Sequence, residues 1–258
     1  MFIPLKDYNP TRRTAVVTIL LILLNFLLFI YQSYLSDEYL RNPLSASDLR
    51  PLKWPSSLEY FVLKDGLIPQ EILGLRHAEI PVGTDRWGNT VIFHRQVSPL
   101  LSLLLSLFMH GSWLHLLGNM LFLWIFGNNV EDRLGRFKFA LFYLLCGIGS
   151  SLVHVAFNLD SLTPVIGASG AVSGVMGAYL LLFPNARLRT LVFIFVLFTF
   201  MDIPAAVFLV IWFVFQFFYA GGGTGIAWLA HVGGFLLGMV LLKILQERKE
   251  PPLAALPQ

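Results

Sequence analysis

Six stretches of the chain are apolar over about the length of a membrane-spanning helix, and polar or glycine-rich segments separate them. They cover residues 15–35, 112–128, 137–157, 169–184, 204–220 and 226–245. A helix needs roughly 20 mainly apolar residues to cross the hydrocarbon core of a bilayer, with about 17 near the short limit. The pattern therefore predicts six transmembrane helices.

Two further apolar stretches, 99–109 and 190–203, are too short to be counted as spans. Asp202 and Pro204 break the second of them from the span that follows. Short apolar segments of this kind occur as re-entrant stretches covered by protein, or as segments that lie in the membrane interface. We expect one of these arrangements for both stretches.

The first span follows Lys6, Arg12 and Arg13, as the apolar region of a signal peptide would. Its apolar core is longer than the apolar region of a signal peptide, which has roughly 7–15 residues, and no A-x-A cleavage site follows it. We interpret it as a retained membrane anchor.

Composition supports a membrane protein. Hydrophobic residues make up 56% of the chain and charged residues 13%, about half the roughly 25% that is usual in soluble domains. The lipid bilayer is therefore an expected partner. The net charge of +3 could suggest nucleic acid, but the basic residues are scattered without a long run, so no nucleic-acid partner is expected.

The basic residues also orient the chain, because loops on the cytoplasmic side of a membrane carry an excess of Lys and Arg. An N-terminus on the inside places 129–136, 185–189 and 246–258 inside as well. Of the 18 Lys and Arg residues, seven lie in the long loop 36–98, none lies in the short outside loops 158–168 and 221–225, and the others lie in or beside the inside segments. A count of five or seven spans would break this agreement.

The expected fold class is an all-α polytopic membrane protein, a bundle of six transmembrane helices. The layout is a cytoplasmic N-terminus (1–14), a first transmembrane helix (15–35), an extracytoplasmic loop (36–98), a core with five further transmembrane helices (99–245) and a cytoplasmic tail (246–258). Trp54, Trp87 and a nearly balanced charge suggest that the loop is ordered.

Polar side chains on three of the spans share one depth, just inside the outer surface. His115 and Asn119 lie near the outer end of the second span, Ser169 starts the fourth, and His231 lies about a turn inside the sixth. Ionisable and amide side chains are costly in a membrane and are candidates for function by default. Scattered structural polar residues would have little reason to share a depth.

The spacing places these residues beside small ones. His115 and Asn119 are four residues apart and share a helix face. Ser169, Ser173 and Gly177 share another, and so do His231, Gly234 and Gly238. If the two glycine-containing stripes pack together, their backbones come close enough for a hydroxyl and an imidazole to meet at about 3 Å, as nucleophile and general base.

Each residue alone has a structural interpretation. Ser169 could cap its helix, His231 could be a satisfied interior histidine, and His115 with Asn119 could hold helices together.

Other chemistries fit the sequence poorly. It contains no HExxH motif, no close Cys/His ligand set, and no glycine-rich nucleotide loop, so neither a metal nor a cofactor is expected. The lone Cys146 allows no intramolecular disulfide.

Four motifs resemble the rhomboid family of intramembrane serine proteases. They are GASGAVSGVMGAY at 167–179, AHVGGFLLG at 230–238, FMHGSWLHLLGNM at 108–120 and VEDRLG at 130–135. The resemblance covers residues 100–245. It departs from the family before Phe108, where PLLSLLLSLF replaces the Trp-containing sequence that many members have.

The resemblance implies a role for each matched residue. Ser169 would be the nucleophile and His231 the general base. His115, Asn119 and the backbone N–H of Ser169 would stabilise the oxyanion, Gly167 would shape the loop before the nucleophile, and His110 would be structural.

The implied function is that of an intramembrane serine endopeptidase whose substrates are transmembrane proteins. Two alternatives stay open, a catalytically silent rhomboid-like protein that binds membrane proteins, and a small transporter. The expected location is a prokaryotic plasma (inner) membrane, with both termini cytoplasmic and the active site opening to the outer face. The oligomeric state and the substrates do not follow from the sequence.

Overall fold

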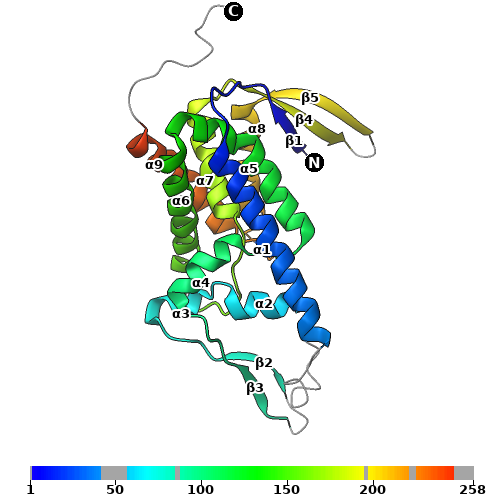
Figure 1. Cartoon of the computed structure of the whole chain (residues 1–258), viewed down its shortest axis with the longest axis vertical. Coiled ribbons are helices and arrows are strands. Elements are labelled where there is room, and N and C mark those ends of the chain that lie inside the picture. Colours follow the sequence, from blue (N-terminus) through cyan, green and yellow to red (C-terminus); the bar gives the residue numbers. More distant parts are fainter. Residues whose placement is uncertain (1, 42–56, 85–87, 195–196, 221–224, 247–258) are drawn as a thin grey trace, which may run out of the picture. The chain divides into compact units, whose positions relative to one another are not determined.

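The computed structural model describes residues 2–41, 57–84, 88–194, 197–220 and 225–246 (Figure 1). Trp54, Trp87 and nearly all of the predicted tail fall outside these ranges, as does most of the predicted loop 221–225. The described chain is mainly helical, with α1 (Val16–Arg41), α2 (Ser57–Asp65), α3 (Pro69–Gly74), α4 (Pro99–Leu105), the 3₁₀ turn η1 (Ser106–Phe108), α5 (Trp113–Leu134), α6 (Arg136–Ala156), α7 (Ser169–Leu182), α8 (Ala205–Phe218) and α9 (Trp228–Leu245).

A helix lies at each of the six predicted spans, and the class of polytopic helical membrane protein is confirmed. Within the described ranges, α1, α6 and α9 are long and apolar enough to cross a membrane. The chain bends sharply between η1 and α5, and α4, η1 and α5 give a fourth span if they are taken as one broken segment. The helices α7 and α8 are apolar but have 14 residues each. Such a helix is about 21 Å long, shorter than the roughly 30 Å of bilayer hydrocarbon.

The contacts divide the chain into two units, and α1, α5 and α6 each continue from one unit into the other. The first unit contains Met1–Ile22, Gly118–Ser150 and Ser169–Gln258, and the second contains Leu23–Leu117 and Ser151–Ala168.

The centre of the first unit is α7, which is buried along ten consecutive residues, Gly170 to Tyr179. A helix that is apolar all round is typical of a buried core position. Its neighbours are α9, which it meets through glycines, and α6, whose Cys146 lies beside Gly174. On α5, the ring of Phe126 packs edge-to-face against Tyr179, with the ring centres 5.0 Å apart.

The first unit also contains a sheet that the sequence analysis did not predict. The stretch 190–203, expected to be re-entrant or interfacial, is a β-hairpin made by β4 (Arg187–Ile194) and β5 (Leu197–Pro204). The strand β1 (Phe2–Asp7) pairs antiparallel with the other edge of β4, which gives the order β1-β4-β5 (Figure 1). Leu188, Thr190 and Val192 are buried at every second position, as expected for a strand with one covered face.

The second unit contains the described parts of loop 36–98. The helices α2 and α3 are followed by a hairpin of β2 (Ile80–Thr84) and β3 (Thr90–Phe93). Leu67 is fully buried and forms a β-bridge with Val165. The loop is therefore paired, through its backbone, with the segment that leads to Ser169.

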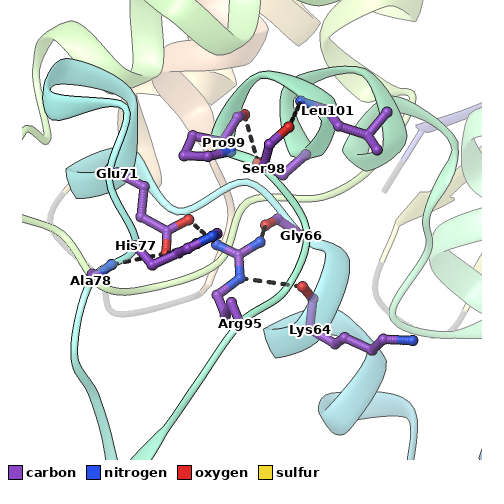
Figure 2. A network of polar contacts seen from close by, with 10 residues as sticks. Lys64, Gly66, Glu71, His77, Ala78, Arg95, Ser98, Pro99 and Leu101 are labelled. Carbon is purple, nitrogen blue, oxygen red and sulfur yellow. Dashed lines mark hydrogen bonds and ion pairs between the residues drawn. The ribbon is translucent and has the colours of Figure 1, made fainter.

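A buried ion pair between Arg95 and Glu71 organises this loop (Figure 2). The same guanidinium donates hydrogen bonds to the backbone carbonyls of Lys64 and Gly66, and Glu71 accepts one from the backbone N–H of Ala78 at 3.0 Å. Burial lowers the pKa of Arg95, and the charge of Glu71 opposes that shift. The pair ties α2, α3 and the end of β3 together.

Candidate active site

Ser169 and His231 meet in the first unit. Ser169 is the first residue of α7, and His231 lies in the first turn of α9. The Oγ atom of Ser169 and the Nε2 atom of His231 are 2.8 Å apart, a hydrogen bond of ordinary length. Both residues are half-buried, so the pair is not sealed inside the bundle.

Glycines bring the two helices to this distance, as predicted. A Cβ atom placed on Gly234 would stand 2.1 Å from the carbonyl oxygen of Gly170, and one on Gly238 would stand 2.0 Å from that of Gly174. A Cβ on Gly177 would stand 2.1 Å from the carbonyl oxygen of Phe235. Real side chains do not approach a backbone so closely. The prediction that the glycine stripes of α7 and α9 face each other is confirmed.

The second ring nitrogen of His231 has a partner that the sequence analysis missed. Its Nδ1 atom is 2.7 Å from Oε1 of Gln216 on α8, and Nε2 of Gln216 donates to the backbone carbonyl of Trp212 at 2.9 Å. Gln216 is 3% exposed. The ring of Trp212 also lies near the imidazole, with the ring centres 6.0 Å apart. An amide inside the otherwise apolar α8 was the signal that could have revealed this residue.

The remaining predicted residues are distributed between the units. Asn119 is buried on α5 in the first unit. His115 lies one turn earlier on α5, in the second unit, where Ser112 caps the helix by accepting a hydrogen bond from the backbone N–H of His115 at 3.1 Å. The roles of His115 and Asn119 as oxyanion donors stay predictions.

His110 and Gly167 lie in well-defined surroundings in the second unit. The His110 ring is fully buried and packs edge-to-face against His115 at 5.0 Å, as a structural residue would. Gly167 has a φ of 117°, a conformation that favours glycine, and its N–H donates to the carbonyl of Ser106 at 2.8 Å. These contacts fix the chain just before α7.

Metal ligands do not gather near these residues. In the ranges that the structure describes, no three His, Cys, Asp or Glu side chains lie at a spacing that could hold a metal ion.

The chain is thus a polytopic helical membrane protein in which a serine at the start of one helix contacts a histidine on a neighbouring helix. The family model of the Rhomboid domain matches residues 97–248 of this chain. The chain therefore belongs to the rhomboid family.

Curated relatives are similar to this chain over part of their length. Rhomboid protein 1, mitochondrial, of Saccharomyces cerevisiae is 30% identical over 153 residues, which are 56% of this chain and 41% of the yeast protein. RHOMBOID-like protein 1 of Arabidopsis thaliana is 32% identical over 145 residues, 53% of this chain and 33% of the plant protein.

Presenilin-associated rhomboid-like protein A, mitochondrial, of Danio rerio is 37% identical over 90 residues, 34% of this chain and 24% of its own length. The chain thus matches less than half the length of each of these relatives. Several of these names are mitochondrial, which argues against the prokaryotic plasma membrane expected for this chain.

Proposed function

We propose that this chain is an intramembrane serine endopeptidase that cleaves transmembrane protein substrates with Ser169 and His231. The observation that carries the proposal is the 2.8 Å contact between the hydroxyl of Ser169 and Nε2 of His231. A serine hydroxyl is a weak nucleophile until a general base within hydrogen-bond reach accepts its proton. The two side chains come from separate helices whose glycines allow them to meet.

The reaction would follow the usual sequence of serine acyl transfer. Nε2 of His231 takes the proton of Ser169 as Oγ attacks the carbonyl carbon of the substrate. The resulting oxyanion would form at the start of α7, where unpaired backbone N–H groups and the helix dipole favour negative charge. His115, Asn119 and the N–H of Ser169 are the proposed donors. His231 then gives its proton to the leaving amine, and water releases the acyl group.

The half-buried position of the pair suits a peptide bond that reaches it from the membrane. A substrate helix hides its backbone in internal hydrogen bonds, so the cleaved segment must unwind before a carbonyl can enter. Substrates with helix-weakening residues such as glycine near the membrane boundary should therefore be preferred.

The proposed orientation has both termini and the α5–α6 turn on the side rich in basic residues. It is supported by the basic residues around that turn, Arg133, Arg136 and Lys138. The active site would then open toward the opposite face.

The decisive experiment uses the purified full chain reconstituted in liposomes. Cleavage of a model transmembrane substrate would be followed together with labelling by a serine-directed fluorophosphonate, with Ser169→Ala as the control. We expect cleavage and labelling in the wild type and neither in Ser169→Ala. A wild type that binds the substrate but neither cleaves it nor takes the label would instead be a silent binding protein. Substrate movement across the liposome without cleavage would indicate a transporter.

A further inference from the structure

The direction of the Gln216 amide is fixed by its two contacts. The carbonyl of Trp212 can only accept a hydrogen bond, so the atom of Gln216 that faces it must be the NH₂ group. The other end of the amide, which faces Nδ1 of His231, is therefore the carbonyl oxygen. An oxygen acceptor at 2.7 Å requires the hydrogen on Nδ1.

This arrangement determines what the other ring nitrogen can do. A neutral imidazole carries one hydrogen, so a hydrogen on Nδ1 leaves Nε2 with a free lone pair. Nε2 is the atom that faces the hydroxyl of Ser169 at 2.8 Å. The amide thus selects the tautomer in which His231 can accept the proton of Ser169.

We propose that Gln216 is a positioning residue that holds His231 in its reactive tautomer and orientation, so that the dyad has a third, supporting member. This inference rests on the proposed function. Gln216 acts through His231, and the substrate need not touch it.

A neutral amide suits this place better than a carboxylate. The helix α8 has no ionisable side chain, and Gln216 is almost fully buried in it. An unpaired carboxylate there would have to be removed from water, which is strongly unfavourable. Gln supplies the acceptor that orients the imidazole without a buried charge, and its own N–H group is satisfied by Trp212.

Within the first unit, the titratable groups on α6, α7 and α9 lie further from the imidazole than Gln216 does, whereas His115 on α5 and His154 on α6 belong to the second unit. On α7 the titratable side chain is Tyr179, ten residues or about 15 Å along the helix from Ser169. On α9 it is Lys243, about 18 Å from His231. On α6, Cys146 lies beside Gly174, more than a turn below Ser169. A charge introduced at position 216 would stand directly beside Nδ1 of His231, closer than any of these groups of the first unit.

The test compares Gln216→Met, which keeps the length and removes the acceptor, with Gln216→Glu, which keeps an oxygen facing Nδ1. Phe215→Leu, at an exposed position of α8, is the control for general effects on this helix. Cleavage kinetics as a function of pH, the rate of fluorophosphonate labelling of Ser169 and the thermal midpoint would be measured for the full chain in detergent.

Gln216→Met should lower kcat by about 10²-fold, the order expected when a catalytic group is misplaced, with little change in KM and a matching fall in the labelling rate. Gln216→Glu should keep most of the wild-type activity that Gln216→Met loses. Because its carboxylate stabilises the protonated imidazole, it should also move the acidic limb of the pH profile to higher pH.

Two results would overturn the inference while leaving the protease proposal intact: an unchanged kcat in Gln216→Met, or equal losses in both variants with no shift of the pH profile. If Gln216→Met is too unstable to assay, the pH profile of Gln216→Glu decides. A wild type that neither cleaves nor takes the label would overturn the proposed function, and the inference with it.

Discussion

Ser169 and His231 share one hydrogen bond, which matters more for reactivity than for folding. A neutral hydrogen bond between side chains contributes only about 1 kcal/mol to stability. Loss of the nucleophile or of its base, by contrast, removes the whole acyl-transfer route. Activity and stability should therefore respond very differently to substitutions at these two positions.

Ser169→Ala and His231→Ala should each abolish cleavage in liposomes, and the double variant should be no less active than either single one. The physical reason is that two residues in one proton transfer act as a unit. Cleavage rates and thermal midpoints of the three variants would be compared. Losses that multiply in the double variant, or clear turnover in one of the single variants, would show that the residues act independently.

Asp7 carries a second buried polar contact, at the other end of α7. Its Oδ2 atom accepts hydrogen bonds from the Tyr179 hydroxyl at 2.9 Å and from the Asn129 amide at 2.5 Å. Burial raises the pKa of the Asp7 carboxyl to about 6, and the hydrogen bond from Tyr179 opposes the rise. The folded protein thus favours the protonated form of Asp7 more than the unfolded chain does.

Since the pKa of Asp7 is raised on folding, its contribution to stability is complete below pH 4 and is lost as the pH rises to about 6. The thermal midpoint of the wild type should therefore fall relative to Asp7→Asn between pH 4 and pH 6 and stay level above that. Midpoints measured in detergent across this range test the expectation. If the wild-type midpoint rises relative to that of Asp7→Asn between pH 4 and pH 6, folding stabilises the ionised carboxylate of Asp7 instead.

At the residue scale, the pairing of Ser169 with His231 could be predicted, because both lie at one depth on helices with small residues. Gln216 could not be paired with His231 in the same way. Its helix gives no second polar residue to define a functional face, and the contact appears only when α8 and α9 are placed side by side. An isolated amide in an apolar segment has many possible partners.

The packing of α7 on α9 depends on the absence of side chains at the crossing. Each glycine there faces a backbone carbonyl rather than a side chain that could move aside. One methyl group is therefore already too large, and the helices can accept it only by separating. The hydrogen bond between Ser169 and His231 bridges the same two helices and would lengthen with them.

Gly234→Ala should lower the thermal midpoint and reduce cleavage by about 10²-fold, because overpacking costs about 1–3 kcal/mol and a shift near 1 Å misplaces the histidine. Gly118→Ala on α5 is the matched control, since a Cβ atom there meets nothing within 4 Å. Cleavage rate and midpoint would be measured for both. An active, stable Gly234→Ala would contradict the close helix crossing.

The hairpin of β4 and β5 shows where apolar content misleads. Phe198, Phe200 and Met201 are apolar although they are exposed on β5. Because apolar residues occupy the exposed as well as the buried positions, the sequence of this stretch resembles a short membrane segment. The strand signal lies in the alternation of β4, where every second residue is buried. That signal becomes decisive only with β1, which is distant in the sequence and pairs with β4.

The buried pair of Arg95 and Glu71 should hold the described part of the loop together. Glu71→Ala should destabilise it by about 3–5 kcal/mol, because the guanidinium is left buried without its counter-ion. The double variant Glu71→Leu with Arg95→Met should recover much of that loss, since no buried charge remains. Rates of limited proteolysis in the loop would be compared. Equal sensitivity of the single and double variants would mean that the pair contributes little.

At the scale of the whole chain, the acidic last turn of α5 attaches the start of α1 to the core of the first unit. Glu131 accepts hydrogen bonds from the backbone N–H groups of Val17 and Thr18, at 2.9 and 2.7 Å. Asp132 does the same for Arg12 and Arg13. Carboxylates at a helix start satisfy its unpaired N–H groups and complement its dipole.

The positions of the six helices could be predicted because each is an apolar stretch, and the predicted spans 169–184 and 204–220 exceed α7 and α8 only by one or two residues at an end. Apolar residues continue beyond the helical part in both, and hydropathy does not record where the helix stops. The contact between the acidic turn and α1 could not be predicted either, because the carboxylate of Glu131 binds backbone N–H groups, which every residue has and which leave no pattern in the sequence. The orientation of the bundle in the membrane stays a prediction from charge.

That orientation can be tested at the two ends of α6, a helix of 21 residues that is long enough to cross a bilayer. After the buried Cys146 is replaced by serine, single cysteines at Phe137 and at Thr163, both exposed, would be treated with a membrane-impermeant maleimide in intact cells. Thr163→Cys should react at once and Phe137→Cys only after permeabilisation, because Phe137 follows the basic α5–α6 turn. Val240→Cys, exposed on α9, should resist labelling in both conditions if that face lies in lipid. The reverse pattern would invert the orientation, and labelling of both ends from the same side would mean that α6 does not cross the membrane.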